Sequence, residues 1–302
     1  MATYDGNPQD YQEIIQSGYE FRLGNYLNRG WELFKQNAGG FIGYVIVYII
    51  LSMIISGIAQ MLGFGNTFLS FILGQVAAIP TVGLGAGFIL VAHRIAKNQE
   101  VEFGNFFDGL KDMVQLWLGN LVAGWLAAMP MMIGMFLAIG PNLFEWIADM
   151  QNPMALTENS EDIMAQLTTM GPKIAMYGGL GLILTIVIST LYSFTQPNIL
   201  FGRLKFWDAM EVSRKIISQK IMSFILLMLV LIFSIAVGMA VLGFLAGVTG
   251  SYPVIAITVI AGLAGLLIYV GFVYCVNYAV YEDIVLNNID GSMEDRIDEI
   301  GG

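Results

Sequence analysis

Charged residues are missing from long stretches of this sequence. No Asp, Glu, Lys or Arg occurs from 36 to 93 or from 221 to 281, which are runs of 58 and 61 residues. About a quarter of the residues of a soluble domain are charged, whereas here 12% are charged and 57% are hydrophobic. An ionised side chain at the centre of a membrane span costs about 2.5–3.5 kcal/mol. The composition therefore excludes a soluble globular domain and predicts two membrane hairpins.

Cysteine and histidine are almost absent as well. The single Cys275 and the single His93 exclude a disulfide framework and a His/Cys metal cluster built from this chain alone. A net charge of −10 argues against binding to nucleic acid. Apart from Lys220 at the very start of the fifth, the expected spans hold no carboxylate or amine, which makes a proton-coupled pump less expected. We predict no catalytic residue, no metal, no cofactor, no nucleic-acid partner and no enzymatic activity.

The apolar stretches that are present define the fold class. Besides the two long runs, the charge-free windows 113–144 and 174–202 fit one span each, because a membrane helix needs about 20 apolar residues. An acidic tail (1–21) should precede the transmembrane domain (22–285), and a second acidic tail (286–302) should follow it. We predict an all-α membrane protein with six transmembrane helices, at about 39–61, 68–92, 114–139, 174–197, 220–247 and 253–281.

The basic residues predict the orientation of the chain. Twelve of the thirteen lie on one side of the expected spans, and only Lys173 lies on the other. By the positive-inside rule, both termini are cytoplasmic in a multi-pass protein of the cytoplasmic membrane. The first 20 residues are acidic and hold no basic residue, so we expect no cleavable signal peptide. The absence of any Asn-x-Ser/Thr sequon hints at a bacterial protein. The outer segment 140–172 is expected to be an acidic surface loop or a pair of short amphipathic helices.

Three segments that precede the first, third and fifth spans share one pattern. Each has apolar and aromatic residues on one helical face and polar or charged residues on the other. Helices of this kind lie in the headgroup region, where aromatic rings are favoured. We expect three cytoplasmic interfacial helices that contact membrane lipids or another protein, with the candidate residues Arg29, Trp31, Glu32, Lys35, Phe106, Phe107, Trp207, Glu211 and Arg214.

Two of these segments also match each other. The run from Gly30 to Lys35 (GWELFK) aligns with the run from Ala209 to Arg214 (AMEVSR), and each precedes a long charge-free stretch. This similarity predicts an internal repeat of surface helix plus hairpin, with the third and fourth spans between the two copies.

Four runs of sequence resemble a group of bacterial membrane proteins. They are LGNYLNRGWELFKQNAGGFIGY (23–44), VEFGNFFDGLKD (101–112), FWDAMEVSRKI (206–216) and YAVYEDIV (278–285). The group includes the YciC-like proteins and the membrane domain found ahead of some glycerophosphoryl diester phosphodiesterases. The resemblance implies a six-helix bundle in the cytoplasmic membrane, without an established activity. No phosphodiesterase domain is expected, because only a short stretch follows the last span.

The fourth span is the most polar of the six. Thr185, Ser189, Tyr192 and Gln196 lie on one stripe of the predicted helix. These side chains could line a polar cavity, or they could form hydrogen bonds between packed helices. Pro80 and Pro130 are expected to kink the second and third spans.

Small and charged residues near the span ends predict contacts within the protein. The glycine-rich run 83–87 and the pairs Gly39/Gly43 and Gly243/Gly247 are expected to form close-packing surfaces. Glu282 and Asp283 are expected to meet a basic residue of a surface helix, either Arg29 or Arg214.

These patterns leave open more than one class of function. We favour a non-catalytic protein that organises lipid or a partner through its cytoplasmic surface helices. The alternative is a small transporter or channel for an uncharged or amphiphilic solute, suggested by the prolines and the polar fourth span. A membrane enzyme that acts on lipid is less favoured, because its acidic and basic residues are scattered.

Overall fold

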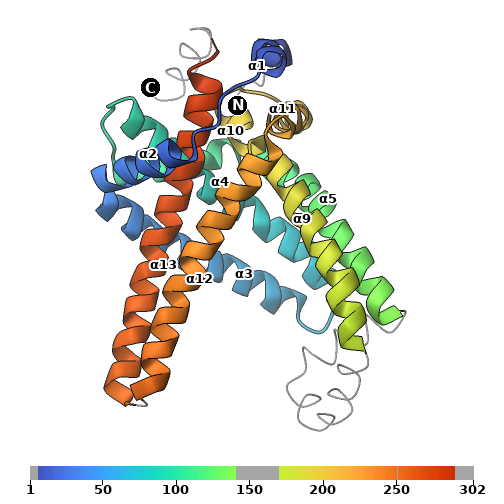
Figure 1. Ribbon diagram of the computed structural model, residues 1–302, viewed down its shortest axis with the longest axis vertical. Helices are drawn as coiled ribbons and strands as arrows, with labels where there is room; N and C mark the ends of the chain where they lie inside the picture. The colour runs from blue at the N-terminus through green and yellow to red at the C-terminus, as the bar shows by residue number, and fades with distance from the viewer. Residues whose placement is uncertain (1–5, 141–169, 250, 290–302) are drawn as a thin grey trace. The chain divides into compact units, whose positions relative to one another are not determined.

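The computed structural model describes residues 6–140, 170–249 and 251–289 (Figure 1). Every regular element in these ranges is a helix. Six helical segments among the described residues are long and apolar enough to cross a membrane: 38–63, 67–96, 103–139, 170–200, 221–248 and 252–286. They confirm the predicted all-α membrane fold. The outer segment 140–172, for which we expect a surface loop or short amphipathic helices, lies almost wholly within 141–169, outside the described residues.

The first two spans form a hairpin of α3 (Ala38–Gly63) and α4 (Thr67–Ala96). The turn between them contains Gly65 in the left-handed region, at φ 79°. Asn66 then begins α4, because its side-chain oxygen accepts a hydrogen bond from the Leu69 amide at 2.9 Å. Ser70 ties the two helices together by donating to the Gly63 carbonyl at 2.8 Å. A tight, capped turn thus connects the two spans that the first charge-free run predicts.

The last two spans form a second hairpin, of α12 (Ile221–Thr249) and α13 (Tyr252–Tyr281). The two helices run side by side in Figure 1, and Tyr269 of α13 donates a hydrogen bond to the Leu231 carbonyl of α12. A turn of π-helix, η5 (Glu282–Leu286), extends α13. Large apolar side chains around the tips of both hairpins are exposed, as expected for surfaces that face lipid.

The third and fourth spans comprise α5 (Met113–Ile139), the π-turn η4 (Ile174–Gly178), α9 (Gly179–Leu191) and α10 (Thr195–Leu200). Residues 121–192 form a compact unit of their own. In this smaller unit, a methyl group added at Gly181 would lie 2.7 Å from the Pro130 carbonyl oxygen. Glycine therefore lets the two helix backbones approach each other closely.

The fourth span is not one uninterrupted helix over 174–197. Its helix stops at Leu191 and resumes at Thr195, so Pro197 lies in the first turn of α10. Proline is tolerated in a first turn, where its missing N–H has no intrahelical partner to lose. Pro80 and Pro130, in contrast, lie inside α4 and α5, which continue past them.

The remaining, larger unit comprises residues up to 120 and from 193 onward. In it, three helices of 14, 10 and 13 residues, called the short helices below, pack on helices of the sixth, second and fourth spans: α2 (Leu23–Gln36), the 3₁₀-helix η2 (Phe103–Asp112) and α11 (Phe206–Ser218). Helix α2 packs on α13, η2 on α4, and α11 on α10. Helix η2 therefore packs on the second span and α11 on the fourth, which are the spans that directly precede them in the sequence. Helix α2, which precedes the first span, packs on the sixth. The described chain thus contains three successive groups of short helix plus two spans, one more than the predicted repeat of two.

The N-terminal residues add to the same unit. The turn η1 (Pro8–Tyr11) and helix α1 (Gln12–Ser17) bury Tyr11 and Ile14, and both elements pack on α11. Tyr19 donates a hydrogen bond to the Ile216 carbonyl at 3.0 Å. Much of the segment expected to be an acidic tail is therefore packed against the fold.

Candidate functional site

The candidate site is the end of the larger unit where α2, η2 and α11 pack, which we call the charged end. Small residues let the helices meet there. A methyl group added at Gly30 of α2 would lie 2.5 Å from Val276 Cγ2 and 2.8 Å from Val276 Cα on α13. Gly109 of η2 approaches the Gly83 carbonyl of α4, and the small Ala209 of α11 is fully buried. Each short helix thus has a small residue in its buried face.

The glycine-rich run 83–87 forms the close-packing surface that the sequence predicts. Gly83 faces Gly109 and Met113, and Gly87 faces the backbone carbonyl of Phe106. The prediction is wrong for the two pairs of glycines. No described atom lies within 4 Å of a methyl group added at Gly39, Gly243 or Gly247, and at Gly43 the nearest is the Phe103 ring at 3.8 Å. Four-residue spacing shows that the glycines of a pair share a face, but not that the face meets another helix.

The α2–α13 contact carries two polar links at its outer edge. Arg29 donates to both carboxylate oxygens of Glu282, with Nε–Oε2 at 3.1 Å and Nη2–Oε1 at 3.2 Å. This two-pronged geometry is the strongest form of an Arg–carboxylate pair, and the bond to Glu282 raises the pKa of Arg29. Tyr26 donates to Asp283 Oδ2 at 2.9 Å. The expected contact with a basic residue is therefore confirmed for Glu282, which meets Arg29, whereas Asp283 bonds to the neutral Tyr26 of the same helix.

The alternative partner, Arg214, bonds within its own helix. It donates to the two oxygens of Glu211 at 3.1 and 2.9 Å. These bonds, together with that of Lys215, lower the pKa of the Glu211 carboxyl.

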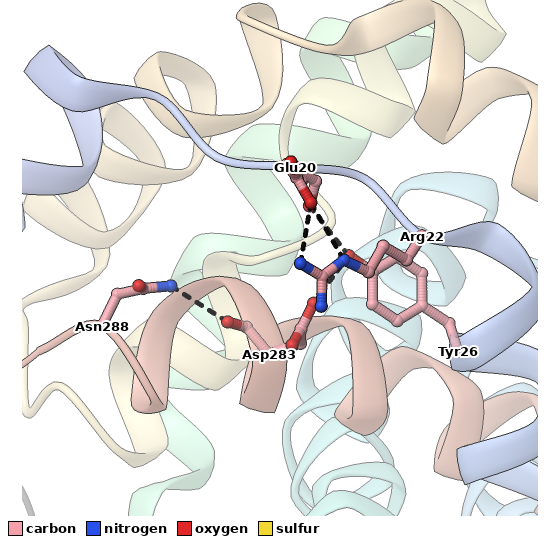
Figure 2. Close-up of polar contacts among 5 residues, drawn as sticks. All are labelled: Glu20, Arg22, Tyr26, Asp283 and Asn288. Atoms are coloured by element: carbon pink, nitrogen blue, oxygen red, sulfur yellow. Dashed lines mark hydrogen bonds and ion pairs between the residues drawn. The ribbon is translucent and has the colours of Figure 1, made fainter.

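The start of α2 and the end of α13 meet in Figure 2. Arg22 pairs with Glu20 at 2.7 Å beside the Tyr26–Asp283 contact, and Asn288 donates to the Asp283 carbonyl at 3.0 Å. Burial, and secondarily the bond to Asp283, raises the pKa of Tyr26 to about 12. Tyr26 therefore stays a neutral hydrogen-bond donor to the Asp283 carboxylate at physiological pH.

The η2–α4 contact repeats this arrangement with the charges reversed. Asp108 directly precedes Gly109, as Arg29 directly precedes Gly30. Asp108 pairs with Arg94 in the last turn of α4 at 3.5 Å, and also with Lys111 at 3.3 Å. In both contacts the residue before the glycine thus pairs with a charge near the end of the long helix.

The α11–α10 contact uses neutral groups instead. Asn198 of α10 donates to the Ala209 carbonyl at 3.0 Å, and Ser213 accepts from the Phe194 amide at 3.1 Å. A buried ion pair lies next to this contact: Arg203 Nη1 is 3.1 Å from each carboxylate oxygen of Asp112. It connects the loop after α10 to the end of η2.

A buried polar core joins the three helices on which the short ones pack. We use this name for His93 of α4, Asn198 of α10, and Tyr278 and Tyr281 of α13, all of which are buried. His93 Nδ1 lies 2.9 Å from the Tyr278 hydroxyl, and Tyr281 donates to Asn198 Oδ1 at 3.1 Å. Our sequence reasoning missed this core. Its signal was one polar residue near the end of the second span, one near the end of the fourth, and two tyrosines near the end of the sixth.

The aromatic candidates differ in exposure. Phe106 is fully buried and stacks on Tyr44, with ring centroids 4.4 Å apart, so it packs inside the protein instead of contacting lipid or a partner. Phe107 is half-buried, with its ring 5.4 Å from that of Tyr44. Trp31 and Trp207, in contrast, are 44% and 63% exposed. They remain candidates for contacts outside the chain.

The charged candidates lie mostly at the surface. Glu32, Lys35 and Arg214 are exposed, whereas Arg29 and Glu211 are half-buried and take part in the ion pairs described above. The faces of α2 and α11 that point away from the long helices therefore carry both signs of charge.

The structure does not place the polar residues of the fourth span on one continuous helix. Thr185 and Ser189 belong to α9, where Ser189 donates to the Thr185 carbonyl at 2.7 Å. Tyr192 lies in the break after α9, and Gln196 lies in α10. The Ser189 hydroxyl thus bonds back to its own helix, as expected for a residue in an apolar span.

No protein-family model, curated protein or solved structure matches this chain. Within the described ranges, no group of three or more His, Cys, Asp and Glu side chains is arranged to hold a metal ion. The function must therefore be argued from the charged end itself.

Proposed function

We propose that this chain is a non-catalytic, multi-pass protein of a bacterial cytoplasmic membrane, related to the YciC-like proteins, with both termini in the cytoplasm. It organises lipid or a partner protein around the charged end. The observation that carries the proposal is common to the three short helices. Each buries one face in the fold and exposes an aromatic ring: Trp31 at 44%, Phe103 at 47% and Trp207 at 63%.

Basic residues accompany these rings. Lys35, Lys111 and Lys215 are exposed on α2, η2 and α11. Tryptophan is favoured at the membrane–water boundary, and a lysine near an anionic membrane surface contributes about 1 kcal/mol of attraction. The combination of rings and lysines on all three helices supports contact with anionic headgroups, or with a protein that lies against the same surface.

The lipid arm of the proposal is tested in nanodiscs that contain both zwitterionic and anionic lipids. We expect the double variant Trp31→Ala/Trp207→Ala to retain several-fold less anionic lipid than the wild type, as counted by native mass spectrometry. The matched control is Phe233→Ala, which removes an exposed ring from the apolar helix α12 and should leave the lipid count unchanged.

The partner arm uses the same variants in affinity capture from membranes. The proposal fails if the wild type shows neither a preference for anionic lipid nor a partner whose capture depends on Trp31, Phe107 or Trp207.

A transporter for an uncharged or amphiphilic solute is the second candidate. The break between Leu191 and Thr195 in the fourth span supports it, because interrupted membrane helices form the substrate sites of many transporters. Ser189→Leu and Gln196→Leu distinguish the two functions. A transporter should lose most of its solute flux in proteoliposomes, whereas a lipid- or partner-organising protein should keep its lipid and partner contacts.

A further inference from the structure

The three contacts at the charged end differ in how the chain connects their helices. Helix η2 follows α4 after residues 97–102, and α11 follows α10 after residues 201–205. Such short connections keep two elements close together even when their side-chain contacts are lost. Helices α2 and α13, by contrast, lie near opposite ends of the described chain. No short connection joins α2 directly to α13, although α3, which follows α2 after Asn37, also packs on α13. The part of the contact that lies beyond α3, at the start of α2, is held by its own packing and ion pairs.

The α2–α13 contact combines a tight apolar crossing with a partly solvated polar edge. Gly30 meets Val276 at the crossing, and a methyl group added at Gly271 would lie 2.9 Å from the Phe34 ring. The Arg29 and Glu282 side chains at the outer edge are 39% and 17% exposed. A partly exposed pair can exchange its partner for water at modest cost, so this edge is suited to open before the apolar crossing.

One stripe of α13 faces the helices that cover it. Gly271 meets Phe34 and Phe41, Tyr278 meets His93, and Glu282 meets Arg29. These positions are four, three or four residues apart once Cys275 is included, so Cys275 lies on the same face of the helix. Its thiol is fully buried. The stripe therefore places a free cysteine on the face of α13 that α2 and α4 cover.

Polar contacts also lead from this edge into the polar core. The Glu282 carboxylate interacts with Tyr278 as well as with Arg29, and the Tyr278 hydroxyl lies 2.9 Å from His93 Nδ1. Arg29 of α2 is thus linked through α13 to His93 of α4. Loss of the Arg29–Glu282 pair would therefore change the surroundings of His93, a buried group in a different hairpin.

We propose that the α2–α13 contact is a releasable seam at the charged end of the protein. Helix α2 separates from α13 at the Arg29–Glu282 edge, while the η2–α4 and α11–α10 contacts stay closed. This opening gives water access to Cys275 and to the His93–Tyr278 pair, and the Arg29–Glu282 pair sets how often it occurs. The inference does not depend on whether the protein organises lipid or moves a solute.

Cys275 is the native reporter for the test, because the chain contains no other cysteine. The rate at which a water-soluble maleimide labels Cys275 is measured by mass spectrometry on the full-length protein in nanodiscs. We expect Arg29→Ala and Glu282→Gln each to raise this rate roughly three- to tenfold, as for loss of a partly buried charged hydrogen bond. The double variant should be labelled no faster than the faster single variant, because both changes remove the same interaction.

Two further variants keep the test interpretable. Arg214→Ala removes an ion pair of similar length on α11 and should leave the labelling rate unchanged. Tyr26→Phe removes only the hydroxyl that bonds to Asp283 and should raise the labelling rate by a smaller factor. It replaces Arg29→Ala in the test if that variant fails to fold. Equal labelling in all variants overturns the proposal, as does labelling that follows global unfolding of each variant measured in the same nanodiscs.

Discussion

Replacing Asp112 with alanine should lower the free energy of unfolding by about 3–5 kcal/mol, the usual cost of removing one partner of a buried ion pair. The Arg203 side chain is 12% exposed and that of Asp112 is 4% exposed, with Arg203 Nη1 3.1 Å from both carboxylate oxygens. An arginine side chain keeps its positive charge in proteins. The variant would therefore leave an uncompensated positive charge in the fold. Chemical unfolding in detergent micelles measures the loss.

Two comparisons separate this effect from the general cost of a mutation. Glu211→Ala removes an exposed ion pair with Arg214 and should cost no more than about 1 kcal/mol. Arg203→Met combined with Asp112→Ala should cost less than the sum of the single changes, because no charge is then left unpaired. A loss below about 1 kcal/mol for Asp112→Ala would contradict the burial of this pair.

The second large effect is expected at Gly87. A methyl group added there would lie 2.7 Å from the backbone carbonyl carbon of Phe106, and a backbone atom cannot swing away as a side-chain end can. Gly87→Ala should therefore force η2 away from α4 and cost about 1–3 kcal/mol, as overpacking usually does. The measurement is again unfolding in micelles, with the accessibility of a cysteine introduced at Lys111 as a local readout for η2.

Gly74 provides the matched control on the same helix. No described atom lies within 4 Å of a methyl group added at Gly74, so Gly74→Ala tests helix propensity alone. It should be neutral, or stabilising by up to about 1 kcal/mol, because alanine is the better helix former. If the two variants were equally stable, η2 would not pack on α4 as described.

The spans could be predicted because each charged residue in a membrane span costs free energy by itself, so the spans appear in the sequence as runs without charge. The run without charges from 221 to 281 directly predicts α12 and α13, and the observed helices begin and end within a few residues of the expected bounds. The break before Thr195 was harder to predict. The polar residues around it, such as Ser193 and Gln196, are also found inside helices, and Pro197 fits inside a first turn as well as at the end of a helix.

The packing partners of the short helices could not be predicted in the same way. An apolar face at helical spacing is expected both for a helix that lies on lipid and for one that packs on protein, and Phe106 shows that the second case applies to η2. The sequence nonetheless contains a sign of the additional group, which consists of η2 and the third and fourth spans. The run from Phe106 to Gly109 (FFDG) matches the run from Phe206 to Ala209 (FWDA), but the alignment of the first and third segments had placed the middle spans outside the repeat.

The return of α2 to α13 also determines the order in which the protein can be assembled. Arg29 is synthesised 253 residues before Glu282, whereas η2 and α11 follow the helices on which they pack by only six and five residues. During synthesis the buried face of α2 therefore lacks its partner until the last hairpin has been inserted into the bilayer. The contact between α2 and α13 is therefore the last of the three short-helix contacts to form.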